Sequence, residues 1–193
     1  MKIGNLKIPD SINKILIIWL SWAGKTTAFD CIKDSLNSKI FPVRRWITRP
    51  RRFGDNLDEN LHISYEDLVK EWDKIDIQWE RDMGDGRIEL YAFPKKETHK
   101  ICLYPWNNFI FSWGLSHPFF INTVIINISS AYKNREQRFI ERSHDVVKKF
   151  PQEFQKRISS EELSPDFYHF NIENNSSLED FYREIKKCLA ILL

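Results

Sequence analysis

The sequence has few glycines, few cysteines and almost no excess of charge. Its 3 cysteines lie far apart and form no CxxC pair, which argues against both a disulfide scaffold and a cysteine-based metal site. The 5 histidines show no metal-ligand spacing either. A formal net charge of +2 is too small for binding nucleic acid by general phosphate neutralisation. Any anion site is therefore expected to be local.

The chain also lacks a long apolar run. Its first such run, residues 15–20, is too short to cross a membrane. Unpaired cysteines favour a reducing compartment, so a cytoplasmic location without a membrane or nucleic-acid partner is expected. Apolar residues make up 42% of the 193 and charged residues 29%, which is typical of a folded globular protein. That length predicts a single domain over residues 1–193.

Apolar runs alternate with helical patterns. Residues 15–20, 100–104, 123–128 and 167–172 read as buried strands. Such strands alternating with helices predict an α/β fold with a parallel central sheet. About fifty weakly patterned residues lie between the first helix and the strand at residue 100. This stretch is the expected inserted lobe.

Four helices are predicted. One follows the first strand, a short one begins near Ser64, a charged one spans residues 131–150, and the last recurs at the helical period up to Leu192. Ser129 or Ser130 is available as N-cap of the third helix. At the start of the last helix, the spacing of Ser176 and Glu179 fits a capping box.

The turn after the first strand contains Ala23-Gly24-Lys25-Thr26. A strand, a small-residue turn and a helix opening on Gly-Lys-Thr together are typical of a phosphate-binding loop. Lys25 would bridge the β- and γ-phosphates of a nucleotide, and Thr26 would ligate Mg²⁺. The full pattern requires a glycine where Trp19 stands, so an ordinary turn with a surface lysine is the alternative. The nucleotide-binding residues expected here are Ser21, Trp22, Ala23, Gly24, Lys25, Thr26 and Thr27.

Five arginines lie within nine residues at the end of a predicted strand, residues 41–48. Paired guanidinium donors suit dianionic phosphates, so a specific phosphate site is favoured over a solvated basic loop or a weak RNA patch. The arginines are Arg44, Arg45, Arg49, Arg51 and Arg52.

Several short segments occur in an informative order along nearly the whole chain. They are Trp46-Ile47-Thr48-Arg49-Pro50, Glu59-Asn60-Leu61-His62-Ile63-Ser64, Trp79-Glu80, Tyr91-Ala92-Phe93-Pro94, Arg138-Phe139-Ile140-Glu141-Arg142, Arg157-Ile158 and Ile172-Glu173-Asn174. In this order the sequence resembles the guanylate kinase-like branch of the P-loop kinases, and within it most closely the ribose 1,5-bisphosphate phosphokinases.

The resemblance implies a three-layer α/β P-loop kinase fold with a parallel central sheet, a small inserted acceptor-binding lobe and a helical lid. The core would comprise residues 11–40 and 100–193, the lobe about 41–99 and the lid about 131–162. The implied activity is transfer of the γ-phosphoryl group of ATP, with Mg²⁺, to a small phosphorylated acceptor. Lid closure in such an enzyme excludes water from the reaction.

The resemblance also implies residue roles. Arg49, Arg52 and Tyr91 would hold the acceptor phosphate. Catalytic roles fall to Lys25 and to lid arginines that close over the donor phosphates, and Asn174 would lie beside the adenine. The lid arginines are Arg138, Arg142 and Arg157. Four carboxylates in the lobe could orient an acceptor hydroxyl or could simply be surface groups: Asp55, Asp58, Glu59 and Glu80.

The positions that read guanine in true guanylate kinases are poorly filled. Leu61 stands where those enzymes carry a tyrosine, and no acidic residue ends the strand at residues 101–104. A ribose bisphosphate-type sugar phosphate is therefore the favoured acceptor. The alternatives are a nucleoside monophosphate kinase, a P-loop hydrolase without an acceptor, and a kinase-shaped module that only binds a phosphorylated ligand. A monomer or a homodimer is expected.

Overall fold

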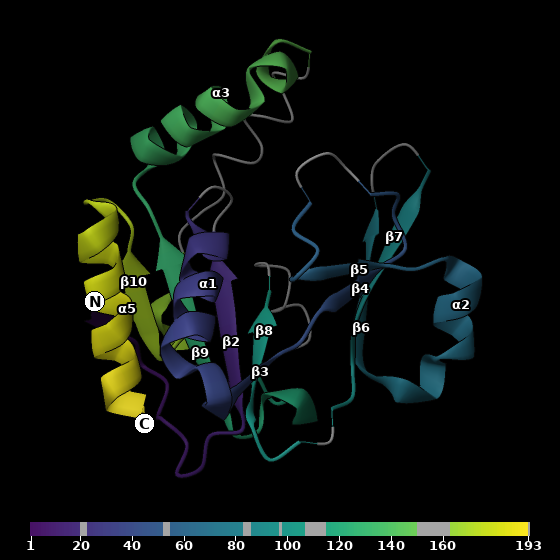
Figure 1. The fold of residues 1–193 in the computed structure, drawn as a ribbon, viewed down its shortest axis with the longest axis horizontal. Coiled ribbons are helices and arrows are strands. Elements are labelled where there is room, and N and C mark those ends of the chain that lie inside the picture. The colour runs from purple at the N-terminus through teal and green to yellow at the C-terminus, as the bar shows by residue number, and fades with distance from the viewer. Residues whose placement is uncertain are drawn as a thin grey trace.

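The computed structural model describes residues 1–19, 23–51, 55–82, 86–96, 98–106, 115–149 and 163–192. These residues form a central sheet with helices on one face and a second, smaller sheet beside it (Figure 1).

The central sheet has six strands in the order β1-β10-β9-β2-β8-β3. The strand β2 pairs in parallel with β8 on one side and β9 on the other, and β1 alone is antiparallel to its neighbour. The α/β fold with a parallel central sheet is thus confirmed. The strands are β1 (Lys2–Ile3), β2 (Lys14–Trp19), β3 (Ile40–Pro42), β8 (Ile101–Pro105), β9 (Thr123–Ser129) and β10 (Phe170–Glu173).

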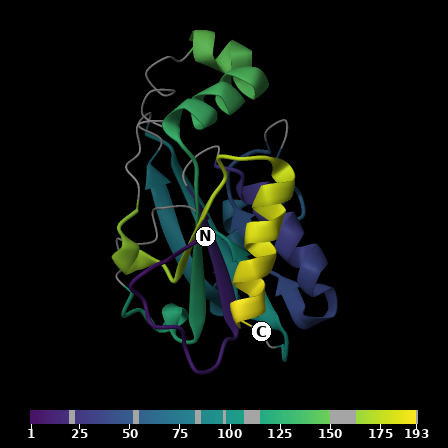
Figure 2. The same cartoon turned by 90° about the vertical axis from the view of Figure 1, so that its left-hand side faces the viewer.

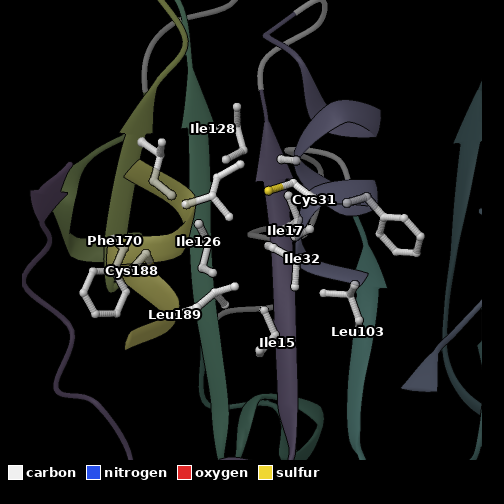
Figure 3. Packing of buried hydrophobic residues seen from close by; sticks show 14 of the residues in the cluster. Ile15, Ile17, Cys31, Ile32, Leu103, Ile126, Ile128, Phe170, Cys188 and Leu189 are labelled. Atoms are coloured by element: carbon white, nitrogen blue, oxygen red, sulfur yellow. The ribbon is translucent and has the colours of Figure 1, made fainter. Parts of the chain in front are cut away.

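Two helices, α1 (Lys25–Leu36) and α5 (Leu178–Leu192), cover one face of this sheet and contact each other. Side chains alternate between the faces of a strand, so Ile15 and Ile17 of β2 point toward these helices. Figure 3 shows both among the apolar side chains of the sheet and the helices. Burying each such side chain contributes roughly 1.5–3 kcal/mol, which fixes α1 against β2.

The opposite face of the central sheet carries aromatic residues. Trp106, which follows β8, stacks on Trp79 with ring centroids 4.8 Å apart, and both contact Phe93. Trp79 and Phe93 belong to the second sheet, so these rings join the two sheets. We call this group the aromatic cluster: Trp79, Phe93, Tyr104, Trp106, Phe119 and Phe120.

The second sheet has the strand order β5-β4-β7-β6. Helix α2 (Tyr65–Lys70) packs Leu68 against Leu90 and Ala92 and lies on the side away from the central sheet (Figure 1). The hydroxyl of Ser64 accepts a hydrogen bond from the amide of Asp67, as expected of its N-cap. The strands are β4 (Arg45–Ile47), β5 (Asn60–His62), β6 (Ile75–Asp82) and β7 (Ile88–Pro94).

The helix α3 (Tyr132–Lys149) follows β9 and extends past the carboxyl ends of the central strands, which both views show (Figures 1 and 2). Among the described residues, no helix is both long and apolar enough to span a bilayer. Short 3₁₀ helices complete the structure: η1 (Asn37–Lys39), η2 (Trp72–Lys74), η4 (Pro118–Phe120) and η5 (Pro165–Phe167).

Three local predictions were wrong. Residues 41–48 are not one strand, because β3 ends at Pro42 in the central sheet and β4 begins at Arg45 in the second. The last helix is capped by Ser177 and not by Ser176, since the amide of Asp180 donates to Ser177 Oγ. Neither Ser129 nor Ser130 is the residue before α3, which begins at Tyr132: Ser129 is the last residue of β9, and the Ser130 hydroxyl donates to the carbonyl of Asn174 at 2.9 Å.

Candidate functional site

The turn between β2 and α1 lies at the carboxyl edge of the central sheet. Gly24 has φ +102, a conformation that residues with a side chain rarely adopt. A Cβ atom at this position would lie only 2.2 Å from Asn174 Nδ2. Both the backbone conformation and the close approach of Asn174 therefore require glycine here.

Trp19 occupies the position where the phosphate-loop pattern has its first glycine. It is the last residue of β2 and pairs in register with Ile128 of β9. Extended, hydrogen-bonded backbone of this kind accepts any residue except proline. The departure at Trp19 thus falls in the strand.

Asn174 connects this turn to α3. Its Nδ2 atom donates to the carbonyl of Ala23 at 2.8 Å. Its own carbonyl accepts a hydrogen bond from Arg138 Nη2 at 2.9 Å, and Arg138 Nη1 lies 3.3 Å from Ser130 Oγ. The structure therefore brings four of the expected residues together: Ala23, Gly24, Arg138 and Asn174. Asn174 was expected beside an adenine, and in this structure its side chain is hydrogen-bonded to the turn.

Lys25 is the first residue of α1, and its ammonium group forms an ion pair with Glu59 of the loop before β5. The Glu59 side chain is 0% exposed. Burial lowers the pKa of Lys25 well below its usual value, and the charge of Arg45 lowers it further. The charges of Asp30 and Asp55 oppose this lowering of the Lys25 pKa because they favour the charged amine. Thr26 is exposed and Thr27 is half-buried on the same turn.

Arg49 makes a two-pronged contact with Asp55. Its Nη1 and Nη2 atoms donate to the two carboxylate oxygens at 2.7 Å and 2.6 Å, which raises the pKa of Arg49. His62 adds a third contact, with Nε2 3.3 Å from Asp55 Oδ2 and Nδ1 3.0 Å from the Arg49 carbonyl. Arg49 is thereby fixed at the end of β4.

Tyr91 lies near Arg49 on the second sheet. Its hydroxyl donates to Glu89 Oε2 at 2.5 Å, and burial together with this bond raises the pKa of Tyr91. The Arg45 guanidinium lies 5.3 Å from the centre of the Tyr91 ring and donates to Asn60 Oδ1 at 2.8 Å through Nη2. Burial lowers the pKa of Arg45 to about 10, which still leaves it charged at neutral pH.

Strand β6 adds Trp79 and Arg81 beside this group. Trp79 stacks on Tyr91 at 5.5 Å, and Arg81 is the register partner of Glu89. The charge of Arg81 lowers the pKa of Tyr91, against the effect of burial. Positive charge from β4, from Arg49 just after it and from β6 thus gathers around one tyrosine, next to the aromatic cluster.

Other expected residues lie outside the described part of the chain. This applies to Ser21, Trp22, Arg52 and Arg157, and to the side chain of Arg142 in α3. The four lobe carboxylates differ in their partners and their exposure. Asp55 contacts Arg49, and Glu59 contacts Lys25. Asp58 forms an exposed ion pair with Lys33 at 3.1 Å, and Glu80 is exposed.

Sequence reasoning assigned no role to Glu89, His62 or Arg81. The cross-strand register that places Arg81 opposite Glu89 depends on the β6–β7 pairing, which the weak pattern of this stretch did not predict. Glu89 and Tyr91 are two residues apart and lie on the same face of β7, but this spacing alone did not mark the strand.

The described residues contain no group of three or more His, Cys, Asp or Glu residues that could hold a metal ion. The hydroxyl of Thr26, exposed at the start of α1, is a hard oxygen donor of the kind that Mg²⁺ accepts alongside phosphate oxygens and water. The residues present therefore fit a nucleotide-associated Mg²⁺ ion.

Comparisons with known proteins bear on the fold. No protein-family model matches the chain, and no curated protein matches it. The structure is similar to the guanylate kinase from Anaplasma phagocytophilum, with a TM-score of 0.58 at 14% identity over 94% of this chain and 86% of that chain. A gluconokinase from Sinorhizobium meliloti 1021 gives a TM-score of 0.47 at 12% identity over 97% of this chain and 95% of that chain. The chain therefore shares the fold of the Anaplasma phagocytophilum guanylate kinase.

Proposed function

We propose that the protein is a phosphotransferase that moves the γ-phosphoryl group of ATP to a small phosphorylated acceptor. The observation that carries the proposal is the Gly24-Lys25-Thr26 turn. It follows the central strand β2, opens α1 and is supported by Asn174 at the Ala23 carbonyl. In a P-loop kinase fold this is the position of the phosphate-binding loop.

The donor side of the proposal uses the start of α1. Amide groups at a helix N-terminus, with the partial positive charge of the helix, favour a phosphate anion. Lys25 would reach the outer phosphates, and Thr26 would hold Mg²⁺, which when bound neutralises developing charge on the phosphates. The adjoining residues Ser21, Trp22, Ala23, Gly24 and Thr27 would contribute amides.

The acceptor side uses the second sheet. Arg49 and Tyr91 lie close together there, and Arg45 lies over the Tyr91 ring. Guanidinium groups with paired donors bind a phosphate dianion strongly. We propose that Arg49, Tyr91 and Arg52 hold the acceptor phosphate.

A ribose bisphosphate-type sugar phosphate is the proposed acceptor, as in the ribose 1,5-bisphosphate phosphokinases. Leu61 on β5 and Pro105 at the end of β8 offer no polar side chain to a guanine base. Transfer would be in line, and the protein would contribute alignment and charge compensation. Arg138, Arg142 and Arg157 are proposed as lid arginines over the donor phosphates.

A binding module without catalysis is the second candidate. The observation that favours it is the engagement of Lys25 by the buried Glu59, because a lysine held by a carboxylate is not free for phosphate. A nucleoside monophosphate kinase differs from the leading proposal only in its acceptor. We also propose a cytoplasmic location and a monomeric or homodimeric state.

A transfer assay tests these alternatives. Wild type, Lys25→Ala and the control Lys33→Ala are incubated with Mg²⁺ and γ-labelled ATP or GTP, and with a panel of sugar phosphates and nucleoside monophosphates. Lys33 is on the same helix but pairs with the exposed Asp58. We expect label transfer to a sugar phosphate by wild type and Lys33→Ala and none by Lys25→Ala. No transfer to any acceptor, together with no binding of either nucleotide, would favour the binding module.

A further inference from the structure

One short loop contacts both of the cations that the proposed function assigns to phosphate. The loop 55–59 precedes β5 on the second sheet. Its first residue, Asp55, engages Arg49 on the acceptor side, and its last, Glu59, engages Lys25 on the donor side. Two carboxylates from five consecutive residues thus cover both proposed phosphate sites.

The Glu59 contact is built into the fold. The side chain is 0% exposed, and Asn56 Nδ2 donates to its Oε1 atom at 3.3 Å. The Glu59 carbonyl accepts a hydrogen bond from the amide of Arg45 at 2.8 Å, which ties the loop to β4. A buried carboxylate is costly unless a cation compensates it. Lys25 provides that compensation.

The Asp55 contact has the geometry that a phosphate would have. A carboxylate and a phosphate both accept two parallel hydrogen bonds from one guanidinium, and Asp55 accepts such a pair from Arg49 at 2.7 Å and 2.6 Å. A phosphate that binds the same Arg49 nitrogens has to displace the Asp55 carboxylate or share these nitrogens with it. The same holds at Lys25, whose single ammonium group faces Glu59.

We propose that loop 55–59 is an internal competitor for phosphate, with Glu59 occupying the donor cation and Asp55 the acceptor cation until the substrates replace them. This inference rests on the proposed function, because it assigns Lys25 and Arg49 to phosphate groups. Glu59 and Asp55 act through these cations and are positioning residues.

The common loop links the two exchanges. When donor phosphates draw Lys25 away from Glu59, the buried carboxylate loses its cation and the loop loses one of its attachments. Asp55 is then held less firmly on Arg49, so the acceptor phosphate binds more easily. Such coupling is reciprocal, and its usual size is roughly 5- to 150-fold in affinity.

Calorimetric titration with a non-hydrolysable ATP analogue and Mg²⁺ tests the competition. Glu59→Gln removes the competing charge while keeping the size of the side chain, and we expect it to bind the analogue about tenfold more tightly than wild type. Asp58→Asn is the matched control, since Asp58 lies in the same loop but pairs with the exposed Lys33. It should bind like wild type. Equal or weaker binding by Glu59→Gln would show that Glu59 only supports Lys25 and would overturn the inference.

Hydrogen exchange on wild type decides the question if Glu59→Gln does not fold. The amides of Asp58 and Asn60 are bonded to the side chain and the carbonyl of Asn56. Binding of the analogue should speed their exchange, whereas unchanged or slower exchange would contradict the release of the loop. If neither wild type nor a folded Glu59→Gln binds the analogue, the proposed function itself fails. Binding by wild type without the expected gain in Glu59→Gln rejects the inference alone.

Discussion

The side-chain amide of Asn174 donates to the carbonyl of Ala23 at 2.8 Å and closes the space above Gly24. The two segments lie far apart in the sequence, and their contact joins the end of β10 to the turn before α1. The carbonyl of the same asparagine receives Arg138 from α3. The turn, the strand β10 and the helix α3 thus meet at one residue.

Gly24→Ala should destabilise the protein and prevent nucleotide binding. The positive φ disfavours alanine by roughly 1 kcal/mol, and the contact with Asn174 adds to this. Gly86→Ala is the control, because Gly86 has φ +83 but nothing within 4 Å of an added Cβ atom. Denaturant unfolding of both variants measures the difference. An equal or smaller loss in Gly24→Ala would contradict the close packing of the turn.

Tyr91→Phe should weaken acceptor binding and leave the affinity for ATP unchanged. The change removes the hydroxyl that donates to Glu89 but keeps the ring that stacks on Trp79. We expect the acceptor KM to rise about fivefold, which corresponds to roughly 1 kcal/mol. Tyr65→Phe, on the exposed face of α2, is the control. A fall in ATP affinity with an unaltered acceptor KM would contradict the assignment of Tyr91 to the acceptor site.

The aromatic cluster should be the main attachment of the second sheet. Trp106→Ala removes a side chain that is 1% exposed, follows β8 of the central sheet and contacts the Trp79 and Phe93 rings of the second sheet, so a loss of about 3–5 kcal/mol in unfolding free energy is expected. Trp72→Ala, at a tryptophan that is 47% exposed, should change stability by no more than about 0.5 kcal/mol. Similar losses in the two variants, measured by denaturant unfolding, would argue against this role.

Stability should fall as the pH drops below about 6.5 because of His169. Its Nδ1 accepts a hydrogen bond from the amide of Ile125 at 3.0 Å, its Nε2 lies 3.1 Å from the Lys7 carbonyl, and burial lowers the pKa of the ring. The unfolded chain therefore takes up a proton that the folded protein resists. The stabilisation is complete above the unfolded pKa and is lost as the pH falls from there toward the lower folded pKa.

His169→Gln cannot take up this proton, so its unfolding free energy should depend less on pH between 7.5 and 5 than that of wild type. The measurement compares the two slopes, since the variant also loses stability at every pH. Parallel curves would show that His169 does not contribute to the pH dependence.

The inner strands of the central sheet could be predicted because they are buried on both faces and read as continuous apolar runs, as in β9. The second sheet could not. In β7, buried polar Glu89 and buried apolar Leu90 follow one another, so no alternation marks the strand. The break between β3 and β4 was missed because Pro42 is followed by Val43, which keeps the run apolar.

The site shows the same limit. The Gly24-Lys25-Thr26 turn was predicted from a local motif, since its parts are consecutive in the chain. The partners of Lys25 and Arg49 were not, because four carboxylates in the lobe looked equivalent in sequence. Only tertiary packing distinguishes the buried Glu59 from the exposed Asp58.

Binding of ATP with Mg²⁺ to wild type and to Lys25→Ala, followed by calorimetry, tests the central claim most directly. The account predicts one site per chain in wild type and a loss of at least about a hundredfold in affinity when Lys25 is removed. Equal affinity in the two proteins, or no binding by wild type and by Glu59→Gln, would contradict a phosphate site at the start of α1.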